Sequence, residues 1–306
     1  MKKKILAIQG SSLKKINIKT DTSFFLGLEA QKRNYDIYYY EPKNLSFING
    51  KVIAVCSKVK FQNNKKTPVI ILKNIILDLI KAKLLLIRSE PPFNQQYINT
   101  TFILEYIAKK IKIINDPKAL REVPEKLFSL RLTKFMPPTL ISEDLEEIKR
   151  FFSKNKKVVI KPIENYSGND VKLLKNFNKD QISKYIKKYH HLMFQKFIPQ
   201  ISKGDKRVFI IDGKVKGAIS RLPIKGSILS NMSKGASAKK IKITYRELKI
   251  SIIVAKELKR KKIYFAGIDF INGKLIGDIN VTSPTGLKTY YDLTGINLAE
   301  YFFDNI

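Results

Sequence analysis

Along the first 120 residues, short apolar runs alternate with amphipathic segments. The predicted strands are 4–9, 36–40, 84–87 and 111–114. The predicted helices are 22–33, with Asp21 or Thr22 as the N-terminal cap, and 95–109. Asn49-Gly50 lies inside the β-rich run 47–52 and predicts a hairpin turn. Because strands that alternate with helices favour a parallel sheet, we expect an α/β domain here.

Beyond residue 120 the pattern changes to paired strands packed with helices. The predicted helices are 125–134, 143–154 capped by Ser142, 178–189 and 245–262, followed by short helices to the end. The predicted strands are 157–161, 171–174, 192–198, a pair within 206–220, 264–271 and 274–281. The stretch 223–240 is rich in Gly, Ser and Lys without periodicity, which predicts a mobile loop. The fold class is therefore α/β followed by α+β, with domains at 1–120 and 121–306.

The composition limits the classes to which the chain can belong. A length of 306 residues favours about two domains, and 44% apolar residues supply material for a core. No apolar stretch reaches the roughly 18 residues of a membrane-spanning helix, and the run after the N-terminal lysines is too short for a signal peptide. Cys56 is the single cysteine, which excludes a disulfide scaffold. We therefore expect a cytoplasmic protein with no membrane partner.

The strong positive charge is spread along the chain. Lys and Arg number 59 against 26 Asp and Glu, giving a net charge of +33, but only nine of the 59 are arginines. Base-reading surfaces favour Arg and interleave aromatic side chains. The scattered lysines are typical of solvated faces, so we expect no nucleic-acid partner; a basic nucleic-acid-binding protein stays open as an alternative. The scarcity of arginine makes Arg88, Arg207 and Arg221 candidates for bidentate contacts to an anion.

The usual arrangements for nucleophilic catalysis are missing from the sequence. The two histidines, His190 and His191, are adjacent at the end of a polar helix and are expected at the surface. Cys56 lies in a β-rich run and is expected to pack there. The chain has neither a Walker A motif nor a G-x-G-x-x-G motif. A reaction that uses a side-chain nucleophile is therefore not expected.

Acidic and amide side chains follow the last predicted hairpin. Asp278 and Asn280 are two residues apart on one strand, so their side chains point to the same face. Asp269, on the preceding strand, can face the same way. Their apolar neighbours indicate burial, and oxygen donors in such a place suit Mg²⁺, which shares its remaining ligands with phosphates. The sequence therefore predicts a metal site at Asp269, Asp278 and Asn280.

A second set of residues suits a nucleotide phosphate. Lys161 ends the hydrophobic run Val158–Lys161 beside a turn, a position from which its ammonium can meet a phosphate. The small-residue loop 165–169 could supply backbone N–H groups to the same anion. Lys126 is a weaker candidate on its own.

Several sequence blocks together resemble the prokaryotic glutathione synthetases, which are ATP-grasp carboxylate–amine ligases. SEPPF within 87–94 and INVTSPTG within 266–286 are the most specific of them. The other blocks are 16–24, 28–39, 45–51, 114–128, 160–162, 203–208 and 220–223. The resemblance covers essentially the whole chain and implies a pre-ATP-grasp domain at 1–120 followed by an ATP-grasp domain at 121–306.

The resemblance also implies a reaction and its residues. ATP and Mg²⁺ (or Mn²⁺) would activate the carboxylate of γ-glutamylcysteine as an acyl phosphate, and glycine would attack it to give glutathione, ADP and phosphate. The implied ATP contacts are Lys126, Lys161, Gly168, Gln195, Lys196 and Ile198, with Asp205 at the ribose. The implied substrate contacts are Asp21, Ser23, Arg88, Ser283, Pro284 and Thr285. The implied catalytic groups are Arg207 and Arg221, the metal ligands are Asp269, Asp278 and Asn280, and the implied assembly is a homotetramer.

The sequence departs from the family pattern at several of these positions. The phosphate loop reads ENYSGNDV, in which Gly168 is the single glycine. Asp278 stands where the family usually has Glu, and the spacing from Asp269 is one residue longer. Leu229 and Ser237 stand where the family commonly places arginines. A divergent paralogue with another substrate, or with weak or no catalysis, therefore stays open as an alternative.

Overall fold

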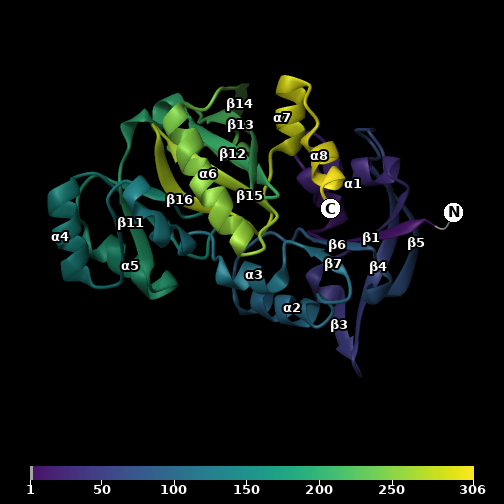
Figure 1. Ribbon diagram of the computed structural model, residues 1–306. Helices are drawn as coiled ribbons and strands as arrows, with labels where there is room; N and C mark the ends of the chain where they lie inside the picture. Colours follow the sequence, from purple (N-terminus) through teal and green to yellow (C-terminus); the bar gives the residue numbers. More distant parts are fainter. Residues whose placement is uncertain (1–2) are drawn as a thin grey trace.

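The computed structural model describes residues 3–306 and begins with a seven-stranded sheet (Figure 1). Its strands are β1 (Lys4–Gln9), β2 (Tyr35–Tyr40), β3 (Leu45–Ile48), β4 (Lys51–Phe61), β5 (Val69–Asp78), β6 (Leu84–Ile87) and β7 (Lys112–Ile114). The order is β3-β4-β2-β1-β6-β7, with β5 on the free side of β4. The pairs β1–β2, β1–β6 and β6–β7 are parallel, which confirms the predicted parallel layer.

The helices that accompany the parallel strands have polar caps. Helix α1 (Thr22–Lys32) connects β1 to β2, α2 (Gln95–Glu105) connects β6 to β7, and α3 (Pro117–Glu122) follows β7. Their caps are Asp21, Asn94 and Asp116. Each cap accepts a hydrogen bond from a backbone N–H of the first turn, which stabilises a helix start by about 1 kcal/mol. The predicted hairpin turn is confirmed, since Asn49 and Gly50 have φ of 46° and 81°.

The second half contains two antiparallel sheets. The first has the order β10-β9-β11-β8 and is covered by α4 (Leu145–Asn155) and α5 (Lys179–Tyr189). Its strands are β8 (Thr139–Ser142), β9 (Val158–Pro162), β10 (Lys172–Leu174) and β11 (Leu192–Lys196). The second has the order β14-β13-β12-β15-β16, and its strands are β12 (Asp205–Ile211), β13 (Lys214–Leu222), β14 (Ser237–Lys240), β15 (Phe265–Ile271) and β16 (Lys274–Asn280). Helix α6 (Tyr245–Arg260) crosses this sheet (Figure 1).

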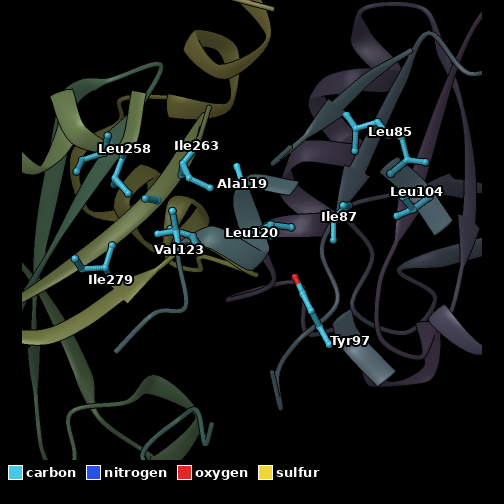
Figure 2. Close-up of a cluster of buried hydrophobic side chains, with 14 of the residues drawn as sticks. Leu85, Ile87, Tyr97, Leu104, Ala119, Leu120, Val123, Leu258, Ile263 and Ile279 are labelled. Atoms are coloured by element: carbon cyan, nitrogen blue, oxygen red, sulfur yellow. The ribbon is translucent and has the colours of Figure 1, made fainter. Parts of the chain in front are cut away.

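The hydrophobic core consists of clusters that join segments far apart in the chain. One buried cluster joins α2 and α3 to α6 and β16, including Leu104, Leu120, Val123, Leu258 and Ile279 (Figure 2). A second cluster brings the C-terminal helices α7 (Leu287–Thr294) and α8 (Leu298–Asp304) back onto α1 and β1. The two termini of the chain therefore contribute to one packed region. Among residues 3–306, no helix combines the length and apolar character needed to cross a membrane.

Several local predictions were wrong. The strand β5 was not predicted; its apolar residues form runs without alternation, and most of them are exposed at the sheet edge. The short helix predicted over 125–134 begins later, at Phe128, and is a 3₁₀ helix over Phe128–Phe135. Asp144, not Ser142, caps α4, because its carboxylate accepts from the N–H groups of the first turn. Within 223–240, the short strand β14 pairs with β13, so this stretch is not a loop throughout.

Asn115 joins the first sheet to β15 and to the segment after β16. Its amide nitrogen donates to the carbonyls of Phe265 (2.8 Å) and Val281 (2.7 Å), and its amide oxygen accepts from the N–H groups of Tyr264 and Phe265 at 2.9 Å each. The side chain is buried. One residue therefore satisfies four backbone groups that would otherwise lie unpaired in the interior.

Asn115→Ala should lower the free energy of unfolding by about 3 kcal/mol, because each buried polar group left unpaired costs about 1–3 kcal/mol. Urea denaturation measures this change. The matched control is Asn305→Ala, which removes a single exposed bond to Tyr301 and should change the stability by less than about 0.5 kcal/mol. A loss of under 1 kcal/mol for Asn115→Ala would contradict the assigned role.

Candidate functional site

The residues predicted to contact ATP and the three predicted metal ligands line one cavity between the two antiparallel sheets. The members are Lys126, Lys161, Gly168, Gln195, Lys196, Ile198, Asp205, Asp269, Asp278 and Asn280. Strands β9 and β11 supply one wall, and β12, β15 and β16 supply the other. Residues that are more than 150 positions apart in the sequence are thus brought together in one place.

A second cavity, of about 390 Å³, lies beside the first and extends to the N-terminal sheet. It is lined by the predicted substrate contacts Asp21, Ser23, Arg88, Ser283 and Thr285. The residues that line both cavities are Glu125, Tyr166, Ser167, Arg207, Arg221, Asn231 and Asn280. The two spaces therefore meet at a boundary that carries two arginines.

Both arginines are held by buried carboxylates. Arg207 donates from Nε and Nη2 to Asp269 at 2.8 and 2.7 Å, and Arg221 lies 2.9 Å from Asp269. Arg221 also forms a bidentate pair with Asp205. The sheet register explains these partners, because Asp205 lies directly opposite Arg221, and Arg207 opposite Asp269.

The arginines shift the pKa values of the two carboxyl groups in this network. Burial alone would raise the pKa of Asp269, but Arg207 and Arg221 bring it well below its usual range. Burial raises the pKa of Asp205, and Arg221 opposes that shift. The two carboxylates and two guanidinium groups of this network hold one another through several hydrogen bonds. The guanidinium groups of Arg207 and Arg221 therefore lie at the boundary of the two cavities in one orientation.

The three predicted metal ligands face the same cavity. The amide of Asn280 lies 3.3 Å from Asp269, and Asp278 lies 3.3 Å from the Nζ of Lys161. No group of three or more His, Cys, Asp or Glu side chains suited to a metal exists within residues 3–306. The donor set is therefore two carboxylates and one amide oxygen, a combination that suits a hard divalent cation sharing its coordination with phosphate oxygens.

Two buried lysines that were predicted to contact phosphate line this cavity. Lys161 donates to the carbonyl of Ile276 at 2.8 Å, and Lys126 donates to the carbonyls of Ile163 and Asn165. Burial lowers the pKa of Lys126, while Asp278 raises it. Both ammonium groups have few protein partners of opposite charge, which is the state expected of a group that receives an anionic ligand.

Arg88 presents an unpaired donor near the second cavity. Its Nε donates to Ser23 at 3.1 Å and its Nη2 to the carbonyl of Pro284 at 2.8 Å. Its Nη1 is buried and has no hydrogen-bond partner among residues 3–306. Burial lowers the pKa of Arg88 to about 10, which still leaves the side chain charged at neutral pH. A buried cation with a free donor is suited to a carboxylate ligand.

Comparison with known proteins decides the family. The family model for the N-terminal domain of prokaryotic glutathione synthetase matches residues 5–121, and the model for its ATP-grasp domain matches residues 125–295. The chain belongs to the prokaryotic glutathione synthetase family. A glutathione synthetase of Bradyrhizobium diazoefficiens is 36% identical over 98% of this chain and 97% of its own length. One of Buchnera aphidicola is 33% identical over the same shares of the two chains.

Solved structures support the fold. The structure of a D-cycloserine synthetase matches with a TM-score of 0.68 and 12% identity, covering 98% of this chain and 99% of its own. A D-alanyl-alanine synthetase A from Vibrio cholerae matches with a TM-score of 0.63 and 13% identity, covering 99% of this chain and 97% of its own. The predicted order of an N-terminal α/β domain and an ATP-grasp domain is confirmed.

The altered phosphate loop of this family member keeps a glycine-like backbone. Ser167 and Asp170 have φ of 53° and 55°, beside Gly168 at 71°. A Cβ added to Gly168 would lie 2.8 Å from the Oδ1 of Asn231 and 3.0 Å from a methyl group of Leu229. The segment predicted to be a mobile loop therefore packs directly onto the phosphate loop.

Ser167→Gly should stabilise the protein by about 1 kcal/mol, because glycine adopts a left-handed backbone without the steric cost that a side chain brings. Thermal unfolding measures the gain. Ser153→Gly, in the last turns of α4, is the matched control and should destabilise by a similar amount. A destabilised Ser167→Gly variant would show that the serine side chain makes a larger contribution than its backbone costs.

The remaining candidate groups lie outside this region. His190 and His191 are exposed beside Glu143, and burial raises the pKa of the Cys56 thiol to about 12. None of them lines either cavity. Glu125 and Asn231, by contrast, line both cavities and were not predicted, whereas Tyr166 belongs to the predicted loop 165–169. For Glu125, the adjacent Lys126 was a usable signal; for Asn231, only the folded loop brings it to the site.

Proposed function

We propose that this protein is an ATP-dependent ligase that joins γ-glutamylcysteine and glycine to give glutathione, ADP and phosphate. The supporting observation is the meeting of two cavities at Arg207 and Arg221. A nucleotide in the first cavity and a peptide in the second would place a terminal phosphoryl group beside a carboxylate at that boundary. Family membership favours phosphoryl transfer to the substrate carboxylate, and among residues 3–306 neither cavity lining includes a histidine or cysteine that could act as base or nucleophile.

In this proposal, β11 and the segment after it receive the nucleotide base. Gln195 is buried in the cavity wall, and Lys196 and Ile198 follow it along the same edge, suited to contact adenine. Lys126, Lys161 and the loop around Gly168 would contact the phosphates. Asp205 was predicted at the ribose, but both its oxygens accept from Arg221. We therefore assign Asp205 the role of holding Arg221.

Asp278 and Asn280 would hold Mg²⁺, with Mn²⁺ as the alternative ion. Asp269, whose two oxygens both accept from arginines, would join them only by exchanging one of these bonds for the ion. Bound there, the ion would neutralise charge on the transferred phosphoryl group. Arg207 and Arg221 would stabilise the negative charge of the transition state, since both are already oriented before the reaction begins. The carboxylate attacks the terminal phosphorus and ADP leaves. The glycine amine then attacks the acyl carbon, and the phosphate leaves with the oxygen that bridged the two groups.

The peptide would occupy the second cavity. Arg88, with its free Nη1, would bind a carboxylate of γ-glutamylcysteine, and Asp21 beside it would favour the ammonium group. Ser23, Ser283 and Thr285 complete this wall through their hydroxyl groups, and Pro284, which was predicted here, holds Arg88 through its carbonyl instead of lining the cavity. Charges of both signs within one cavity match a zwitterionic dipeptide better than a simple anion. A cytoplasmic location and assembly as a homotetramer belong to the same proposal.

An ADP-release assay with each substrate omitted in turn tests the proposal. ADP should form only when ATP, Mg²⁺, γ-glutamylcysteine and glycine are all present, and glutathione should appear in equal amount. ADP that needs a different amine would overturn the assignment of glycine. The replaced residues Leu229 and Ser237 favour a second candidate, a paralogue with weak catalysis, which predicts calorimetric ATP binding with near-background ADP release.

A further inference from the structure

Glu125 binds the chain segment at the end of β16 and just after it. Its Oε1 accepts hydrogen bonds from the N–H of Val281 (3.0 Å) and from the N–H and Oγ1 of Thr282 (3.1 and 2.8 Å). Its backbone carbonyl also accepts from the N–H of Ile279 at 3.3 Å. The residue lines both cavities. One glutamate thus holds the chain from 279 to 282.

The segment held in this way carries groups from both halves of the site. Asn280 lies inside it and faces Asp269, and Ser283 follows it and donates to the carbonyl of Arg88 at 3.1 Å. Because three donors converge on one carboxylate oxygen, the segment has little freedom to rotate. The alignment of the metal-binding amide with the peptide cavity therefore depends on the position of Glu125.

The other side of Glu125 is fixed by its neighbours in the sequence. Lys126 donates to carbonyls of the loop that enters the phosphate turn, and Val123 lies in the same buried cluster as Ile279 (Figure 2). The stretch 123–126 thus contacts the phosphate loop through Lys126 and the end of β16 through Glu125. Residues 123–126 therefore connect the cavity proposed for the nucleotide rigidly with the cavity proposed for the peptide.

We propose that Glu125 is a positioning residue, which aligns the 279–283 segment with the phosphate loop by means of the hydrogen bonds to its Oε1. The proposal rests on the proposed ligase function. It predicts that Glu125 acts on turnover rather than on nucleotide affinity, because its side-chain hydrogen bonds go to Val281 and Thr282 and not to β11, where the predicted adenine contacts begin. The bonding pattern, not the negative charge, is the property that matters.

Kinetics of Glu125→Ala and Glu125→Gln test this. Glu125→Ala should lower kcat about 100-fold, since displacement by about 1 Å can cost that much, while KM for ATP stays within about threefold. Glu125→Gln keeps an oxygen that can accept the same donors and should recover kcat to within about tenfold of the unmodified protein. The control is Glu122→Ala, three residues before Glu125 in the chain. It removes an exposed pair with Lys261 and should leave kcat unchanged.

A double-mutant cycle with Thr282→Val separates positioning from general loss of stability. Thr282→Val removes the hydroxyl that donates to Glu125, so its effect on kcat should nearly disappear in the Glu125→Ala background. Thermal unfolding of each variant reports the fold. If Glu125→Ala does not fold, the kcat values of Glu125→Gln and Thr282→Val decide whether Glu125 positions the segment.

The outcomes are distinct. An unchanged kcat in folded Glu125→Ala, additive effects in the cycle, or Glu125→Gln no more active than Glu125→Ala would each overturn the inference while the ligase function stands. Unmodified protein that releases no substrate-dependent ADP would overturn the proposed function and this inference together. The inference is supported if kcat falls in Glu125→Ala and largely recovers in Glu125→Gln, while KM for ATP stays within about threefold.

Discussion

Replacing Asp278 with asparagine should lower kcat at least about 100-fold while leaving the fold intact. Asp278 is partly exposed to the cavity and pairs with Lys161 through one oxygen at 3.3 Å. The substitution keeps the size of the side chain and removes one negative charge from the proposed Mg²⁺ site. The concentration of Mg²⁺ needed for half-maximal activity should therefore rise as well. Steady-state assays over a Mg²⁺ series measure both effects.

The control for this prediction is Asp292→Asn, which alters an exposed pair with Lys288 on α7. It should change neither kcat nor the Mg²⁺ requirement, because surface pairs contribute little. Full activity in Asp278→Asn with an unchanged Mg²⁺ requirement would rule out Asp278 as a metal ligand.

Replacing Arg221 with methionine should lower the free energy of unfolding by about 3–5 kcal/mol, the usual cost of breaking a buried ion pair from one side. Asp205 then loses both its hydrogen bonds from Arg221, and Asp269 keeps only Arg207. Chemical denaturation measures the loss. The double variant Asp205→Asn, Arg221→Met should recover part of it, because it no longer buries an uncompensated charge.

The same network gives a pH dependence with a defined sign. The pKa of Asp269 is lower in the folded protein than its ordinary value of about 3.9, so the unfolded chain binds the proton more readily. Its contribution to stability is therefore complete above about pH 5 and is lost as the pH falls. Arg221→Met should weaken this acid-dependent contribution. A variant as stable as the unmodified protein, at pH 7 and at pH 4, would contradict the assigned network.

The sequence was sufficient for elements whose signals are local. Lys161 could be placed because a continuous apolar run predicts β9, and the side chain at its end follows directly. Asp278 and Asn280 could be placed on one face because their spacing matches the period of a strand. The order of strands and helices up to β7 likewise predicted a parallel sheet, since that pattern depends on neighbouring residues alone.

The ion-pair network could not be predicted in the same way. Arg207 and Arg221 were recognised as unusual arginines, but their pairing with Asp269 and Asp205 depends on the register of β12 with β13 and β15. Three strands must pair before any of these contacts exists. Glu125 was passed over for a similar reason, because its donors at 281 and 282 lie more than 150 residues away in the chain.

Exposed and irregular segments were hardest to predict. β5 is an edge strand whose apolar residues point to solvent as well as to the core, so it lacks the alternation typical of a half-buried strand. In the predicted phosphate loop, Ser167 takes a left-handed backbone that glycine normally favours. Leu229 and Asn231 pack beside the neighbouring Gly168, a contact that exists only in the folded chain.

Isotope transfer tests the central claim most directly, that a substrate carboxylate takes the terminal phosphoryl group of ATP at the boundary of the two cavities. γ-Glutamylcysteine with ¹⁸O at both oxygens of its cysteinyl carboxylate would be incubated with ATP, Mg²⁺ and glycine. The released phosphate would then be analysed by mass spectrometry. We expect one ¹⁸O atom in each phosphate formed, because the bridging oxygen of the acyl phosphate leaves with phosphorus. Phosphate free of ¹⁸O, formed together with glutathione, would contradict the account.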